Sequence, residues 1–201
     1  MRSTAFLAAS LFLAAVPLRA ANPFLNAPDD KPVAAAFKGT EWGDEIGSND
    51  LPLSGTVVTT RLAKTAWGEI YKIEFKDLKS KAEKKRELRP EYFIVTDDKI
   101  VLLNEENNDD AVKKISAMDR APEFEQSNIY GISSGKFNHQ EGPWETTIEL
   151  KKDECTYMAS HNSGHFKKLV WKKNVGLIEY AGGYGARQDG YRLKRVPTKK
   201  A

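Results

Sequence analysis

The expected fold is decided by the stretch His165-Phe-Lys-Lys-Leu-Val-Trp-Lys-Lys-Asn-Val-Gly-Leu-Ile-Glu-Tyr180, with Ala181-Gly-Gly-Tyr-Gly-Ala-Arg-Gln-Asp-Gly190 and Tyr191-Arg-Leu-Lys-Arg195 after it. Two apolar runs, Phe166 to Trp171 and Val175 to Tyr180, flank a short polar break. A third run, Tyr191 to Val196, follows a glycine-rich segment. Bursts of β-branched and aromatic residues with turn residues between them predict consecutive antiparallel strands. Glycine adopts positive φ without steric cost, so the glycine-rich segment can turn back on itself.

The same pattern recurs through the rest of the chain. Further strands are predicted at residues 55–63, 67–78, 91–96, 100–103, 144–150 and 155–159, with a weaker one at 129–132 and a loop over 133–143. Tyr71, Ile73 and Phe75 alternate with charged residues, which places one set in the core and the other in water. The runs at 91–96 and 100–103 are apolar on consecutive residues. That pair is therefore expected to be buried on both faces or to lie under a helix.

Between these strands we expect one short helix and one basic connection. Asn108, Asp109 and Asp110 provide capping oxygens and first-turn acids, and apolar residues then recur on one side of the expected helix until Pro122. Residues 77–89 are rich in Lys and Arg. This segment fits a short helix or a long hairpin connection, and we favour the hairpin with a solvated tip over a surface for anions.

The two ends of the chain differ from this body. Residues 1–21 combine an early Arg, an uncharged apolar run and small residues at the end, the pattern of a secretory signal peptide. The apolar run is too short for a membrane span. Residues 22–50 are rich in Pro, Ala, Asp and Gly and are expected to form an extended arm, and residues 197–201 a basic tail. The sequence thus predicts a periplasmic or secreted protein with no membrane span.

Composition bounds the folded part. Residues 51–196 are long enough for one β domain with its own core. Cys155 is the only cysteine, so stability must come from packing rather than from an intrachain disulfide, and its surroundings favour a buried apolar role over a reactive thiol. The chain has 31 Lys+Arg and 28 Asp+Glu, and removal of Arg2 and Arg19 leaves 29 basic residues. This near balance argues against a dedicated nucleic-acid-binding protein, and we expect a monomer.

The candidate contact site lies around the glycine-rich segment. Tyr180, Tyr184, Arg187 and Tyr191 surround the glycines, and Trp42 lies in an acidic-aromatic cluster nearer the start of the chain. Tyr and Arg are enriched in recognition surfaces because they bring area and hydrogen bonds at low entropic cost. The alternative is a twisted hairpin whose tyrosines pack over gaps left by glycine, and packing is also the commoner fate of a Trp such as Trp42.

Catalytic and metal-binding patterns are weak. His161 and His165 have a spacing that would suit a metal site on a helix, but Asn162, Ser163 and Gly164 between them mark a turn. No sequence pattern supports a hydrolase site. The candidate groups would be Ser133-Ser134, Cys155 with His161, and the carboxylates of Glu145, Glu149 and Glu179. The glycine-rich segment lacks the Lys-Ser/Thr of a phosphate-binding loop. We therefore expect no cofactor and no enzyme activity.

The expected fold is mainly β: a curved antiparallel meander of about eight to ten strands, forming a half-barrel or a small, lipocalin-like barrel with one helix on it. The first functional hypothesis is a non-enzymatic binding protein that holds a small apolar or amphipathic ligand in the concave face. The second is a module that binds an envelope protein through the Tyr/Gly-rich edge and the basic loop, and a hydrolase is third. A ligand carrier should leave a cavity of some hundreds of Å³ inside the sheet, instead of an interior filled by the larger aromatic residues.

Overall fold

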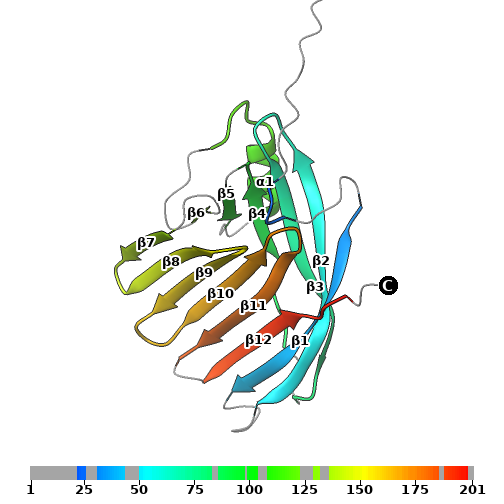
Figure 1. Ribbon diagram of the computed structural model, residues 1–201, viewed down its shortest axis with the longest axis vertical. Coiled ribbons are helices and arrows are strands. Elements are labelled where there is room, and N and C mark those ends of the chain that lie inside the picture. Colours follow the sequence, from blue (N-terminus) through cyan, green and yellow to red (C-terminus); the bar gives the residue numbers. More distant parts are fainter. Residues whose placement is uncertain are drawn as a thin grey trace, which may run out of the picture.

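In the part of the chain that the structure describes, twelve strands form one antiparallel sheet that curls into an open half-barrel, with one short helix packed on it (Figure 1). This confirms the predicted fold class. The computed structural model describes residues 22–25, 31–43, 50–82, 86–97, 99–103, 108–122, 129–131, 136–185 and 188–198. The strand order is β6-β5-β4-β3-β2-β1-β12-β11-β10-β9-β8-β7. Each strand lies beside its neighbour in sequence, except that β1 and β12 pair in the middle of the sheet and β6 and β7 are its two edges.

The elements follow in order along the chain. They are β1 (Val33–Gly43), β2 (Leu51–Lys64), β3 (Glu69–Ser80), β4 (Glu91–Val95), β5 (Lys99–Leu103), α1 (Asn108–Ser116), β6 (Ile129–Gly131), β7 (Lys136–Glu141), β8 (Trp144–Lys151), β9 (Glu154–His161), β10 (Phe166–Lys172), β11 (Gly176–Tyr184) and β12 (Asp189–Arg195). The terminal meander that the sequence predicted is thus β10, β11 and β12, paired in that order.

Two strands lie where the sequence predicted none. We expected residues 22–50 to be an extended arm, but β1 occupies the centre of the sheet between β2 and β12. The run of alanines and the polar residues of β1 hide its alternation, and its strand geometry is set by pairing on both sides. We also expected a loop over 133–143, but β7 pairs with β8 from Lys136 to Glu141. The sequence of β7 has no alternation of apolar and polar residues, which is the signal from which a strand is predicted.

The segment expected to be a helix or a hairpin connection is a connection in its described part. Strand β3 continues to Ser80, and residues 81–82 and 86–90 then lead to β4 without helical structure. The connection is not simply solvated, because Ala82 is buried and Arg86 is nearly so. The expected helix exists but ends at Ser116, before Pro122.

The helix lies on the outer face of the curled sheet. One apolar cluster contains Ile70, Tyr92, Ile94, Val101 and Leu103, and Val112 and Ile115 of α1 pack against it. Tyr92 Oη donates to Asp109 Oδ1 of the helix (3.1 Å), and Trp67 Nε1 donates to the carbonyl of Met118, two residues after the helix ends (2.9 Å). The consecutive apolar residues of β4 and β5 are therefore buried on both faces, as predicted.

The main core fills the inner face and contains residues from both halves of the sheet. Its largest fully buried side chains include Trp171, Tyr71, Phe37 and Phe93, and its other members come from β1 to β5 and from β8 to β12. A segment before β1 adds Phe24, which is 1% exposed. This core stabilises the fold without a covalent crosslink, because buried apolar area is the main favourable term in folding. Among the described residues, no helix is long and apolar enough to cross a membrane.

The two open ends of the half-barrel differ in composition. At the Phe24 end, Asn22–Leu25 lies against the β4–β5 turn and the β10–β11 turn. At the opposite end, β1 and β3 finish, β12 begins, and Arg86 reaches across the inner face. We call the first the Phe24 end and the second the Arg86 end. The Arg86 end carries the polar and exposed aromatic groups from which the candidate site is built.

Candidate functional site at the Arg86 end

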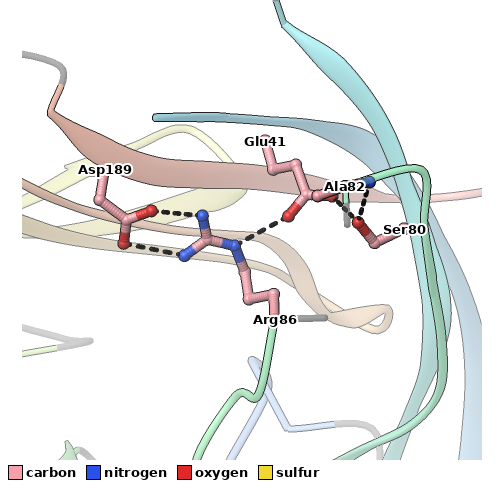
Figure 2. Close-up of polar contacts among 5 residues, drawn as sticks. All are labelled: Glu41, Ser80, Ala82, Arg86 and Asp189. Atoms are coloured by element: carbon pink, nitrogen blue, oxygen red, sulfur yellow. Dashed lines mark hydrogen bonds and ion pairs between the residues drawn. The ribbon is translucent and has the colours of Figure 1, made fainter. Parts of the chain in front are cut away.

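Arg86 joins the β3–β4 connection to two strands of the sheet (Figure 2). Its Nε lies 3.0 Å from Glu41 Oε2 on β1, and its Nη1 and Nη2 lie 3.0 and 2.6 Å from the two carboxylate oxygens of Asp189 on β12. Ser80 Oγ donates to the second oxygen of Glu41 and accepts from the backbone N–H of Ala82. A planar guanidinium with several fixed donors suits two carboxylates at once. These residues, Glu41, Ser80, Arg86 and Asp189, are the charged network.

Arg86 interacts strongly with Glu41, which is buried, and weakly with Asp189, which is exposed. Glu41 is 1% exposed, whereas the side chain of Asp189 is 55% exposed. Burial lowers the pKa of Arg86, but the Asp189 and Glu41 carboxylates outweigh this effect and hold the pKa above its ordinary value. A buried carboxylate needs its cation, so Glu41 fixes Arg86 in place. The connection is thereby held over the inner face.

A layer of tyrosines lies next to the charged network. The Arg86 guanidinium lies 5.3 Å from the ring centroid of Tyr191, and Tyr191 stacks on Tyr180 at 5.5 Å between centroids. Tyr180 is 3% exposed, and its hydroxyl donates to Glu91 Oε1 at 2.5 Å. Lys167 Nζ lies 2.6 Å from the same oxygen. Burial, then the neighbouring Tyr191 and Glu91, raises the pKa of Tyr180 well above its usual value.

Glycine makes room for this layer. A Cβ placed on Gly182 would lie 2.9 Å from the Tyr191 hydroxyl, so Tyr191 lies directly over Gly182 on the inner face. On the outer face, Trp42 lies over Gly190 and stacks on Phe166 with 6.5 Å between ring centroids. This is the packing arrangement considered as the alternative to a contact site. The structure thus places Tyr180 and Tyr191 against each other on the inner face and Trp42 against Phe166 on the outer face, and Arg187 lies outside the described residues.

Tyr184 belongs to a different, exposed group. Trp144 on β8 and Tyr184 on β11 are 42% and 54% exposed, and the imidazoles of His161 and His165 lie between them. The ring centroids are 5.0 Å apart for Trp144 and His161, 5.6 Å for the two histidines, and 4.0 Å for His165 and Tyr184. Strand alternation places Trp144 on the same face as buried Ile148, and Tyr184 on the same face as Tyr180. These four rings, which we call the aromatic rim, therefore line the inner face at the Arg86 end.

Ser163 fixes the two imidazoles. Its Oγ lies 2.6 Å from Nδ1 of His161 and 2.5 Å from Nδ1 of His165, and its backbone N–H donates to Nδ1 of His161 at 3.0 Å. Nδ1 of His161 is therefore an acceptor, so the serine hydroxyl donates to His161 and accepts from His165. In their neutral forms, His161 then carries its proton on Nε2, whereas Nε2 of His165 is an acceptor. Between the rings of Trp144 and Tyr184, the two imidazoles thus present one hydrogen-bond donor, Nε2 of His161, and one acceptor, Nε2 of His165.

The aromatic rim and the charged network are continuous. Tyr184 pairs with Asp189 across β11 and β12, and Asp189 holds Arg86. The structure brings His161 and His165 together, but each directs Nδ1 at Ser163. Within the described ranges, no group of three or more His, Cys, Asp or Glu residues is placed to hold a metal ion. Cys155 lies apart from them in the core, where burial raises the pKa of its thiol to about 11.

Several residues of this site were not found from the sequence. Glu41 lies on the same face of β1 as the buried Phe37. A carboxylate on the buried face of a strand would have indicated a buried partner, but β1 itself was not predicted. Glu91 begins a strand that is otherwise apolar and buried, which is a comparable signal. Arg86 was predicted only as one of many solvated basic residues. No local pattern identifies Arg86 as the partner of Asp189, because 103 positions separate the two residues.

The inner face towards the Phe24 end is largely filled. A cavity of about 20 Å³ lies beside Val33, Thr59, Trp171, Leu177 and Arg195. That volume has room for about one water molecule. Of the aromatic residues that could fill the interior, Tyr71 and Trp171 are buried in the core and Phe75 packs against it. Trp67 lies in the outer cluster and Trp144 in the aromatic rim.

Comparisons with known proteins add no further assignment. No protein-family model matches the chain, and a search of curated proteins found no similar sequence.

Proposed function

We propose that this is an exported, non-enzymatic binding protein that takes an amphipathic ligand at the aromatic rim. The observation that carries the proposal is the pairing of two large exposed rings, Trp144 and Tyr184, with fixed polar groups between them on a concave face. Binding sites commonly combine apolar and aromatic walls with a few oriented polar groups. The apolar part of the ligand lies on the two rings, and its polar part meets the imidazole Nε2 atoms and Asp189.

The cavity of some hundreds of Å³ that we expected for a carrier is not found among the described residues, so a ligand of this protein lies at the surface of the inner face rather than enclosed within it. A cavity of about 20 Å³ is far below the several hundred Å³ that usually surround an enclosed small molecule. A purely apolar ligand would need such an enclosure to leave water. An amphipathic ligand needs only one apolar surface and nearby hydrogen-bonding groups, which the aromatic rim provides.

The remaining parts of the proposal rest on the sequence and on local chemistry. Export is supported by the signal-peptide pattern of residues 1–21, and the lack of a nucleic-acid partner by the near balance of charges. A binding role without catalysis is supported by the engagement of Ser163, whose hydroxyl and backbone N–H are both used to orient the imidazoles.

The test uses tryptophan fluorescence of the chain from Ala21 onward. Single-chain amphiphiles with different head groups are titrated below their micelle-forming concentrations. Trp144→Ala should weaken binding by about tenfold or more, as expected for an aromatic anchor. Leu62→Ala is the matched control, since Leu62 is 39% exposed and lies on β2, outside the aromatic rim. Equal affinities for the wild type and Trp144→Ala would refute the site.

A second candidate function is a protein-interaction or envelope-associated module. It is favoured by the position of β7, an edge strand that pairs on its other side with β8, the strand that carries Trp144. An extended segment of a partner could add to such an edge while its side chains contact the rim. A photo-crosslinking residue at position 144, tested in the exporting host, distinguishes the two functions: a crosslinked protein supports the module, and a crosslinked small molecule supports the ligand.

A further inference from the structure

A short segment before β1 fills the Phe24 end in the manner of a bound peptide. Asn22–Leu25 belongs to no helix or strand, yet Phe24 is 1% exposed and Asn22 is 6% exposed. Leu25 also packs against the main core and lines the small cavity. The segment is thus almost as buried as the strands, although no strand pairing holds it.

The contacts of the segment are specific to its residue types. The Asn22 side-chain amide donates to the Thr96 carbonyl at 3.0 Å and to the Lys99 carbonyl at 3.4 Å, and its Oδ1 accepts from the Phe24 N–H at 3.0 Å. The backbone N–H of Asn174 donates to the Pro23 carbonyl at 2.8 Å. A side-chain amide has two N–H donors for the carbonyls of one turn and an oxygen that accepts from the peptide backbone, whereas a hydroxyl has a single hydrogen to donate.

The aromatic anchor enters between the two halves of the sheet. Phe24 is part of the core cluster that joins β1–β5 to β8–β12, and Lys173 Nζ lies 5.6 Å from the centroid of its ring. The site is therefore formed by the β4–β5 turn on one side, the β10–β11 turn on the other, and the apolar inner face below. All of these parts come from the sheet and none from the segment.

We propose that the Phe24 end is a peptide-binding site that recognises an Asn-Pro-Phe-Leu sequence and is filled here by the chain's own Asn22–Leu25. Residues 26–32 connect the segment to β1, so its binding is intramolecular. A tether this short gives an effective concentration on the order of millimolar. The same segment supplied by a free peptide or by a second copy of the chain competes for the site. This inference is independent of the ligand proposed for the aromatic rim.

The experiment separates the segment from the sheet after folding. The chain from Ala21 onward carries a protease recognition sequence in place of residues 26–30 and is cut once folded. A fluorescein-labelled peptide with the sequence of residues 21–30 is then added, and its binding is followed by fluorescence anisotropy, with circular dichroism to monitor the fold. A peptide with Phe24→Ala and a peptide of scrambled sequence are the controls.

The expected result is that the cut protein keeps its β-sheet spectrum and exchanges its own segment for the labelled peptide in a saturable manner. The Phe24→Ala peptide should compete about tenfold less well or worse, because Phe24 is the segment's aromatic anchor and is only 1% exposed. Failure of a still-folded cut protein to capture the peptide overturns the proposal. Equal competition by the scrambled peptide, or unfolding that added peptide does not reverse, overturns it as well.

Discussion

Replacing Arg86 by Met tests whether the charged network holds the Arg86 end together. Met retains most of the apolar stem but removes the guanidinium, so Glu41, which is 1% exposed, loses its cation and keeps the Ser80 hydroxyl among its partners in the described residues. Breaking a buried ion pair by removing one partner costs about 3–5 kcal/mol. The pair with Asp189 adds little, since that side chain is 55% exposed. We expect Arg86→Met to lower the free energy of unfolding by about 3 kcal/mol.

A double-mutant cycle assigns this loss to the Glu41 pair. Glu41→Gln alone removes the buried negative charge and leaves Arg86 with Asp189, so its cost should be only about 1–2 kcal/mol. In the double variant Arg86→Met/Glu41→Gln, position 41 carries no buried carboxylate without a cation. The double variant should therefore be about 2 kcal/mol more stable than the sum of the two single losses predicts.

Urea unfolding followed by tryptophan fluorescence and circular dichroism measures these values. With a slope of about 2 kcal/mol per M, a loss of about 3 kcal/mol shifts the midpoint by about 1.5 M. Lys151→Met is the control, because its pair with Glu149 is largely exposed and should change stability by less than about 0.5 kcal/mol. A cost for Arg86→Met no larger than that of the control, or strictly additive single effects, would refute the reasoning.

Three further predictions follow from the inner face and the central pairing. Burial raises the pKa of Tyr191 to about 12, so between pH 10 and 12 the folded state keeps a phenol proton that the unfolded chain has lost. The free energy of unfolding should therefore fall as the pH rises from about 10 to 12. Urea titrations should show a smaller fall for Tyr191→Phe than for the wild type. Cys155 is fully buried with a pKa near 11, so iodoacetamide at pH 8 should label it only at the rate of unfolding, and rapid labelling of folded protein would contradict this. A Cβ on Gly39 would lie 1.8 Å from the Arg192 carbonyl oxygen, so Gly39→Ala should disrupt the β1–β12 pairing and lower the melting temperature, whereas an unchanged melting curve would contradict that close approach.

Most of the sheet was predictable because its strands carry their own signal. The alternation of Tyr71, Ile73 and Phe75 and the paired apolar runs of β4 and β5 are consequences of burial on one face or on two. In contrast, β1 is a strand because β2 and β12 pair with it on both sides. Its sequence alone does not reveal pairing with residues about 150 positions later.

The candidate site was predictable only where neighbours in sequence are neighbours in space. His161 and His165 were identified as a pair because one turn joins them, although the role of Ser163 between them depends on side-chain orientation. Tyr184 was found, but as part of a tyrosine group from which the structure separates it. Trp144 was predicted only as the first residue of the strand over 144–150, and its exposure was not predicted. It lies at the open end of its strand, where the curled sheet no longer covers it.

The pairing of β1 with β12 has a consequence for synthesis. Strands β1–β6 and β7–β12 form two sequential meanders, and the β1–β12 ladder joins them. A ribosome, which releases the chain from its N-terminus, delivers β1 early and β12 last. Until residues 189–195 emerge, the backbone groups on one edge of β1 are unpaired, and the apolar inner face of β1–β6 is not packed against β12 and its neighbours. Unpaired strand edges and exposed apolar surface are the features that most favour aggregation. Premature termination a few residues before Asp189 would leave every nascent molecule permanently in that state.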